Sequence, residues 1–310
     1  MVTKWDRIIF SVIALVVVGG FVFWKDVKGV LNKSEGVALE KVEKKGKKDK
    51  EGDKESSEAA TADYPAVNIA GKWEMPQELV EISGIAWLDK DRFACVQDEL
   101  GTIFIYSLAS KSVVKEIPFG NAGDYEGIAV TGSTAYVVRA DGKLFEVSGF
   151  ESGKPAVKQY ATHLTVKQDV EGLCYDAMGK RLLLSIKGAE PHTKAYKGIY
   201  GFDLSTKTMD KEPVYKIDLA QAALSGGGKK SRFEPSDLDI HPTSGELYIT
   251  DASGGKLAVM KTNGEIRQVY GLDKREFTQP EGISFNADGE LFISNEGGKG
   301  RGNILKVVLP

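Results

Sequence analysis

The segment GDYEGIAV, from Gly123 to Val130, runs from an acidic turn into an apolar stretch that is typical of a β-strand. The sequence repeats this pattern four more times, as EISGIAWLD (81–89), DVEGLCYDA (169–177), EPSDLDIHP (234–242) and QPEGISFNA (279–287). Each copy is followed by two further short apolar runs, and every copy except the last by a third. The copies recur about every 45 residues, which is the length of a four-stranded β-propeller blade.

We therefore predict an all-β fold in which residues 64–310 form a five-bladed β-propeller of four-stranded blades. A six-bladed ring is the alternative, and it would need a further blade inside the longer interval between the third and fourth copies. Insertions at 188–197 and 220–233 account for that interval in the five-bladed fold. The last copy lacks its fourth strand, and we expect AVNIAGKWEM (66–75) to supply it and so close the ring.

The N-terminal residues differ in kind from the repeats. Ile8–Trp24 is uncharged over about 17 residues, near the lower limit for a membrane-spanning helix. Tryptophan, lysine and arginine flank it, as they flank membrane spans, and no small-residue cleavage site follows. We predict a cytoplasmic tip and an uncleaved transmembrane anchor within residues 1–30. Residues 31–63 are rich in Lys, Glu, Asp and Ser and lack aromatic residues, which predicts a charged, disordered linker.

Composition and motifs argue against several classes of function. The formal net charge of −3 gives no electrostatic basis for binding nucleic acid. The sequence contains no P-loop, no G-x-S-x-G elbow and no G-x-G-x-x-G followed by a helix, which disfavours a nucleotide enzyme and a serine hydrolase. Cys95 and Cys174 form no C-x-x-C motif, and we expect them to be buried.

Alignment of the five copies reveals two columns that are rich in carboxylates. The leading column holds Glu81, Asp124, Asp169, Glu234 and Gln279, and the column two residues later holds Ser83, Glu126, Glu171, Ser236 and Glu281. Residues i and i+2 of an extended chain share one face, and the first strand of a propeller blade lies innermost. We therefore expect both columns to ring one mouth of the central channel. Unpartnered carboxylates in such a ring raise one another's pKa, and a divalent cation would relieve their repulsion.

These columns predict a Ca²⁺ site, because Ca²⁺ accepts six to eight oxygen ligands and the columns lack histidine and cysteine. The predicted metal ligands are Glu126, Glu171, Glu281, Asp124 and Asp169. Further ligand contacts are expected from Glu81, Ser83, Glu234 and Ser236, with Arg139 and Lys187 as an anion-binding side. The alternative is that each E-G-I is a turn into a strand, with glycine at positive φ, the glutamate in water, and Arg139 and Lys187 as exposed turn charges.

The ordered motifs EISGIAW, DYEGIAV, DVEGLCYD, PSDLDIHP and QPEGISF…LFISNEGG resemble the SdiA-regulated proteins, the membrane-anchored β-propellers of the YjiK/CarP type. The resemblance covers residues 64–310. It implies a propeller on the periplasmic side of a bacterial inner membrane and a behaviour linked to calcium. It carries over Glu126, Glu171 and Glu281, whereas Ser83 and Ser236 depart from the glutamate pattern. It implies no catalytic mechanism.

We expect a monomeric, membrane-tethered, calcium-binding propeller that binds or senses a small ligand or an envelope protein. A calcium-dependent hydrolase of the phytase, phosphodiesterase or lactonase kind is one alternative, since it would need only a general acid or base beside the metal. Asp124 and Asp169 are the candidates for that role. The other alternative is a protein-interaction scaffold that docks partners on a propeller face.

Overall fold

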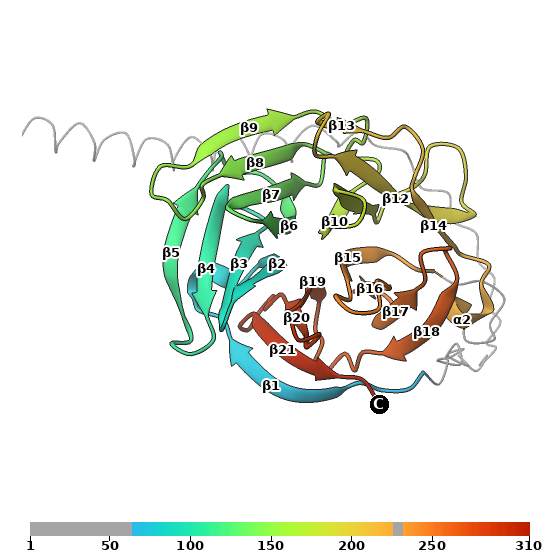
Figure 1. Cartoon of the computed structure of the whole chain (residues 1–310). Coiled ribbons are helices and arrows are strands. Elements are labelled where there is room, and N and C mark those ends of the chain that lie inside the picture. Colours follow the sequence, from blue (N-terminus) through green and yellow to red (C-terminus); the bar gives the residue numbers. More distant parts are fainter. Residues whose placement is uncertain (1–63, 226–231) are drawn as a thin grey trace, which may run out of the picture. The chain divides into compact units, whose positions relative to one another are not determined.

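The chain divides into two units, Met1–Ser57 and Glu58–Pro310. The computed structural model describes residues 64–225 and 232–310, all of which belong to the second unit. The described strands form five antiparallel sheets arranged around a central axis (Figure 1), which confirms the five-bladed propeller. The predicted anchor and linker, residues 1–63, lie outside the described residues. Within the described part of the chain, no helix is long and apolar enough to span a membrane.

In each blade the first strand lies nearest the central axis, and the later strands lie progressively farther from it. The first blade contains β2 (Ile82–Asp89), β3 (Arg92–Gln97), β4 (Thr102–Ser107) and β5 (Ser112–Pro118). The second contains β6 (Tyr125–Thr131), β7 (Thr134–Arg139), β8 (Leu144–Ser148) and β9 (Ala156–Tyr160). The fourth contains β15 (Pro235–Ile240), β16 (Leu247–Asp251), β17 (Lys256–Met260) and β18 (Ile266–Gly271).

The third blade carries both predicted insertions. It contains β10 (Val170–Asp176), β11 (Arg181–Ile186) and β12 (Tyr196–Asp203), and its outer edge is split into β13 (Thr208–Met209) and β14 (Tyr215–Asp218), which both pair with β12. The first insertion connects β11 to β12. The second connects β14 to β15 and includes a short helix, α2 (Ala222–Ser225).

The fifth blade is completed by the N-terminal end of the propeller, as predicted. It contains β19 (Pro280–Phe285), β20 (Leu291–Asn295) and β21 (Asn303–Val308), and its outer strand is β1 (Asn68–Glu74). β1 pairs with β21 in an antiparallel register from Asn68↔Val308 to Glu74↔Asn303. A 3-10 turn, η1 (Gln77–Leu79), then leads from this strand to β2. The closure covers the outer edge of β21 and gives the fifth blade its fourth strand, which is how propellers close their ring.

Every innermost strand contains the same irregularity. The register of the first two strands shifts at Ser83–Gly84, Glu126, Glu171, Ser236 and Glu281, so these residues have no Cα partner on the second strand. Such a bulge bends the strand and redirects the side chain of the extra residue. The alternation expected of a regular strand is therefore interrupted at the position where the sequence places its second acidic column.

A glycine follows the bulge residue in every blade except the fourth, and close packing leaves this glycine no room for a side chain. A Cβ atom on Gly127 would lie 2.8 Å from the backbone nitrogen of Leu173 and 2.9 Å from the carbonyl oxygen of Glu171. A Cβ atom on Gly282 would lie 2.5 Å from the carbonyl oxygen of Ser83. Neither glycine has positive φ. The E-G pair thus marks close packing between innermost strands, which explains the glycine better than a turn or a ligand does.

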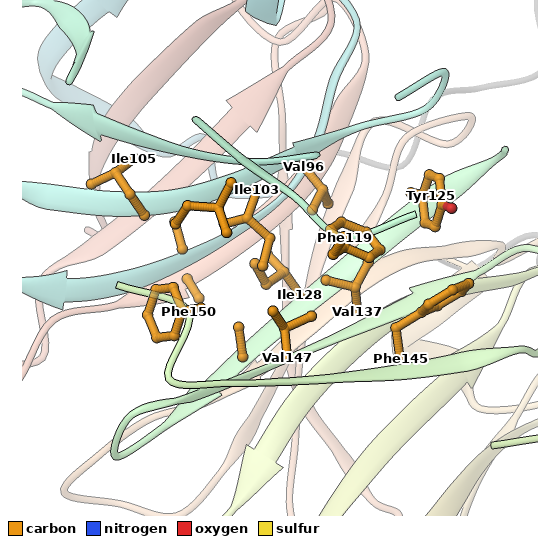
Figure 2. Close-up of a cluster of buried hydrophobic side chains, with 14 residues drawn as sticks. Val96, Ile103, Ile105, Phe119, Tyr125, Ile128, Val137, Phe145, Val147 and Phe150 are labelled. Carbon is orange, nitrogen blue, oxygen red and sulfur yellow. The ribbon is translucent and has the colours of Figure 1, made fainter. Parts of the chain in front are cut away.

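The spaces between blades are filled by apolar side chains. Figure 2 shows the cluster between the first and second blades, where Val96 and Ile103 meet Ile128 and Val137. Phe119 joins the cluster at one end and contacts the ring of Tyr125 edge to face, with a centroid distance of 5.1 Å. Burying one such side chain stabilises the fold by about 1.5–3 kcal/mol. Cys95 and Cys174 are buried and free, as predicted.

Candidate functional site

The bulged residues of the innermost strands form an electrostatically connected group. Glu171 and Glu281 are 4% and 5% exposed, while Glu126 is half-buried. Burial raises the pKa of Glu126 far above its usual range, and the charges of Glu171 and Glu281 raise it further. Interaction with the neighbouring carboxyl of Asp124 also raises the pKa of Glu126. The structure therefore brings predicted site residues of the second, third and fifth blades together.

Lys187 supplies a positive charge within this group. It follows β11 and its Nζ donates to Glu171 Oε1 at 3.1 Å. Burial lowers the pKa of Lys187, but the charges of Glu171 and Glu281 outweigh it, and the pKa is raised overall. Glu171 nevertheless has a raised pKa, because its burial dominates over the attraction of Lys187. Lys187 thus offsets part of the repulsion between these carboxylates.

A second group of carboxylates lies where the first and fifth blades meet. Glu81 precedes β2, Asp98 follows β3 and Glu296 follows β20. One carboxylate oxygen of each lies within 4.8 Å of those of the other two. Two oxygens bound to one Ca²⁺ at about 2.3–2.6 Å can be at most about 5 Å apart, so a single ion can contact all three. We call Glu81, Asp98 and Glu296 the three-carboxylate group.

The pKa shifts in the three-carboxylate group point to uncompensated negative charge. Burial raises the pKa of Asp98 to about 6, with a further contribution from the charge of Glu81. Burial raises the pKa of Glu296 to about 8, and the charges of Glu281, Asp98 and Glu81 add to this effect. Glu281 thereby connects the three-carboxylate group to the group around Lys187. Both shifts favour the protonated form, and Glu296 remains protonated to a higher pH than Asp98 does.

Several oxygens around this group lack a hydrogen bond. Asp98 Oδ1, Glu281 Oε2 and Asn295 Oδ1 are buried and have no hydrogen-bond partner among residues 64–225 and 232–310. Asn295 is fully buried at the end of β20, and its Nδ2 donates to Asn303 Oδ1 at 3.0 Å, which leaves the amide oxygen free. Buried polar atoms are normally paired, so these acceptors are free to interact with a cation or with a hydrogen-bond donor from solution.

Three of the other predicted ligands, Ser236, Glu234 and Arg139, have protein partners instead. Ser236 Oγ donates to the carbonyl oxygen of Pro280 at 2.6 Å. Glu234 accepts hydrogen bonds from Ser253 at 2.8 Å and forms an ion pair with Arg232. Arg139 forms an ion pair with Asp141, two residues away. This contact agrees with the alternative that Arg139 is a charged turn residue and not part of an anion-binding site. Asp169 has positive φ and its pKa is raised mainly by burial. Ser83 Oγ is buried and has no partner within the described structure.

Sequence reasoning did not single out Glu296, and it placed Glu81 among the further ligand contacts and not among the metal ligands. Glu296 stands one residue after Asn295, the position aligned with Asp98, Arg139, Lys187 and Asp251 at the ends of the second strands. That alignment was the available signal. It identifies the correct edge of the blades, but it cannot show which side chain turns inward after the last paired residue.

Comparison with known proteins places the chain in a family. The SdiA-regulated family matches residues 61–298, whereas none of the curated proteins compared with the chain matches it. A solved glutaminyl cyclase from Myxococcus xanthus is similar, with a TM-score of 0.57 and 17% identity over 79% of this chain and 96% of that chain. Virginiamycin B lyase from Staphylococcus aureus gives a TM-score of 0.43 and 13% identity over 72% of this chain and 66% of that chain. These identities show a likeness of fold alone. Because the family match spans most of the sequence, the protein belongs to the SdiA-regulated family.

Proposed function

We propose that this propeller is a calcium-binding protein of the cell envelope, and that the three-carboxylate group holds the ion. The observation that carries the proposal is the convergence of Glu81, Asp98 and Glu296 within 4.8 Å beside free buried acceptors. Asn295 Oδ1 and Glu281 Oε2 are oxygens of the kind that complete a Ca²⁺ shell. The group contains oxygen ligands only, which favours Ca²⁺ over Zn²⁺.

The group around Lys187 has a different role in this proposal. Lys187 and Glu171 form an ion pair at 3.1 Å. The charge of Glu281 raises the pKa of Lys187, and the charge of Glu171 raises the pKa of Glu126. This arrangement presents both a cation and protonated carboxyls beside the ion site. It suits the binding of a polar ligand at the channel mouth, and so supports a binding or sensing role. The ligand is either a small molecule or an envelope protein.

The tether completes the proposal. Ile8–Trp24 anchors the protein in the inner membrane, and the charged segment 31–63 separates the anchor from the propeller, which lies in the periplasm. Cell fractionation tests this step. The full chain is expected in the membrane fraction and to be digested by protease added to spheroplasts, whereas a chain without residues 1–30 is expected in the soluble fraction. A soluble full chain, or a protected propeller, would contradict the tether or its orientation.

The calcium site is tested by calorimetric titration of the full-length chain in detergent. We expect the wild type to bind Ca²⁺ with a Kd of about 10⁻⁵–10⁻³ M, the range of weak sensor and extracellular sites. The variant Asp98→Asn/Glu296→Gln is expected to lose binding, because two of the three carboxylates become neutral. Glu78→Gln, an exposed acidic residue in η1, serves as the matched control and is expected to bind like the wild type.

A second variant separates the two carboxylate groups. Glu126→Gln/Glu171→Gln removes charge around Lys187 while it leaves the three-carboxylate group intact, so it is expected to retain Ca²⁺ binding. Loss of binding in this variant, with retention in Asp98→Asn/Glu296→Gln, would move the ion to the group around Lys187. Absence of binding by the folded wild type would refute a calcium site in the channel mouth altogether.

A further inference from the structure

The first insertion of the third blade encloses a cavity apart from the channel mouth. The cavity has a volume of about 210 Å³. Its walls come from residues 163–168 before β10, residues 190–193 in the insertion, Tyr196 and Tyr200 of β12, and residues 211–213 before β14. Three separate segments therefore converge on one small hollow, and the insertion, rather than the propeller repeat, supplies one of its walls.

Glu190 is the chemically significant residue of this cavity. Glu190 is 7% exposed, and its Oε2 accepts a hydrogen bond from the Tyr200 hydroxyl at 2.7 Å. Its Oε1 is buried and has no hydrogen-bond partner among the described residues. A Cβ atom on Gly198 would lie 2.3 Å from that oxygen, so the glycine provides the room in which the carboxylate lies.

A nearby lysine does not satisfy the free oxygen. Lys197 is close enough for the charge of Glu190 to raise its pKa, although burial acts in the opposite direction and lowers the pKa overall. Its Nζ donates to the backbone carbonyl oxygens of Lys187 and Gly188, away from the carboxylate. A buried carboxylate with one unpaired oxygen is costly unless a donor reaches it. Within the described ranges 64–225 and 232–310, only the Tyr200 hydroxyl donates a hydrogen bond to this carboxylate.

The walls of the cavity favour a cation over an anion. Two carboxylates, Glu190 and Glu212, line it together with one lysine, Lys211. Tyr196 and Tyr200 add aromatic surface, and the ring of His163 meets that of Tyr200 edge to face at a centroid distance of 5.3 Å. Carboxylate and aromatic groups together are a common means of holding an organic cation. A metal ion fits less well, because the only converging set of metal-binding side chains in the described residues is the three-carboxylate group.

We propose that this cavity binds a small organic cation that carries N–H donors, either a primary ammonium or a guanidinium compound. One N–H group donates to Glu190 Oε1 and so completes the hydrogen bonding of the carboxylate. The carbon skeleton lies against the aromatic wall of Tyr196 and Tyr200. The volume is below the range of about 300–1,000 Å³ typical of sites for drug-sized ligands, so the occupant is a small molecule. The site is separate from the proposed calcium site.

The test is a calorimetric titration of agmatine into the full-length chain in detergent, in the presence of Ca²⁺. We expect the wild type to bind agmatine and Glu190→Gln to bind it about tenfold or more weakly, as expected for the loss of a charge-assisted hydrogen bond. Glu116→Gln removes an exposed carboxylate on β5 and is expected to bind agmatine like the wild type. Asp98→Asn/Glu296→Gln is also expected to retain agmatine binding, which separates this proposal from the calcium site.

A ligand series on the wild type keeps the proposal testable should Glu190→Gln fail to fold. Choline carries a positive charge without an N–H donor and is expected to bind more weakly than agmatine. Butyrate, an anion of similar length, is expected not to bind. The proposal is overturned if the folded wild type binds neither agmatine nor putrescine at 10 mM, if choline binds as well as agmatine, or if Glu190→Gln binds agmatine as tightly as the wild type.

Discussion

Individual carboxylates in the channel mouth differ in how their charge is offset. Glu171 receives a hydrogen bond from Lys187, whereas Asp98 Oδ1 has no partner within the described residues. The two environments lie close enough for Glu281 to influence both. Lys187 thus offsets charge in one part of the mouth, whereas the three-carboxylate group forms no ion pair with a lysine or arginine of residues 64–225 and 232–310.

This difference predicts that rising pH lowers the stability of the calcium-free propeller, and that calcium binding opposes this loss. Burial and the nearby charges of Glu281, Asp98 and Glu81 raise the pKa of Glu296 to about 8 from an ordinary value of 4.5. A carboxyl whose pKa is higher in the folded state stabilises the fold at pH values below its unfolded pKa, and this stability is lost as pH rises through the folded pKa. Without calcium, the stability contributed by Glu296 should therefore decrease between about pH 4.5 and pH 8.

Thermal unfolding of the wild type and Glu296→Gln from pH 4 to pH 9, with EDTA or Ca²⁺, measures this effect. Relative to Glu296→Gln, the wild type with EDTA is expected to lose stability as pH rises, and Ca²⁺ is expected to raise its Tm more at pH 8 than at pH 5 because binding requires ionised carboxylates. Parallel pH profiles for the two proteins in EDTA would show that Glu296 ionises normally in the fold.

At Gly127 the close approach of two blades leaves no room for a side chain. A Cβ atom there would lie 2.7–2.9 Å from atoms of Leu173 and Glu171, two of them backbone atoms that cannot turn aside. We expect Gly127→Ala to lower the free energy of unfolding by about 1–3 kcal/mol, the usual cost of overpacking. Urea denaturation gives the value. Gly300→Ala is the control, since its Cβ would meet only one atom at 3.5 Å, and equal losses in both variants would contradict the packing argument.

Among the structural elements, the innermost strands explain both what sequence could predict and what it could not. The repeated motif, the four apolar runs and the closing segment predicted the blades and the pairing of β1 with β21, because hydrophobic periodicity and repeat length determine them. The bulges at Glu126, Glu171 and Glu281 break the two-residue alternation, and no local pattern announces them. The site also depends on Glu296 and Asn295, which approach the first blade only after the ring closes.

The turn between β12 and β13 connects the third blade to the second through one residue, Lys207. Its Nζ lies 2.5 Å from Glu146 Oε2 and over the ring of Tyr136, at 5.3 Å from the centroid. The Glu146 side chain is only 9% exposed. Burial alone would raise the pKa of Glu146, but hydrogen bonding to Lys207 and Tyr160 lowers it overall. The contact therefore keeps a poorly solvated carboxylate charged between two blades.

Lys207→Met tests this connection, because methionine keeps most of the apolar stem and removes the charge. The variant is expected to lose about 1–3 kcal/mol of unfolding free energy at pH 7, the cost of leaving a buried charged group unsatisfied. The loss should shrink as pH falls below 4.5 and through the lowered pKa of Glu146, because the carboxyl then becomes neutral. Lys299→Met, at an exposed position between β20 and β21, is the control. A loss that does not change with pH would indicate that Lys207 contributes through packing alone.

The whole propeller is held closed by strands from opposite ends of its sequence. β1 and β21 are joined only by backbone pairing and side-chain packing, while consecutive strands of each blade are also joined by the loops between them. Asn68 and Val308 are Cα partners in this pairing, and both are exposed. Antiparallel partners lie about 4.5–5.5 Å apart at Cα, within the range that a disulfide can bridge.

A disulfide between Asn68→Cys and Val308→Cys should therefore stabilise the propeller as a unit. Closing a loop of this length restricts the unfolded chain, and the entropic estimate is about 5–6 kcal/mol, less any strain in the folded state. We expect the oxidised double variant to unfold at a higher temperature than its reduced form, and the single variant Asn68→Cys to show no such difference. If opening of the ring precedes unfolding of the blades, the disulfide will also slow unfolding, which stopped-flow denaturation measures. A crosslinked protein with unchanged stability and unfolding rate would mean that the blades unfold without first separating β1 from β21.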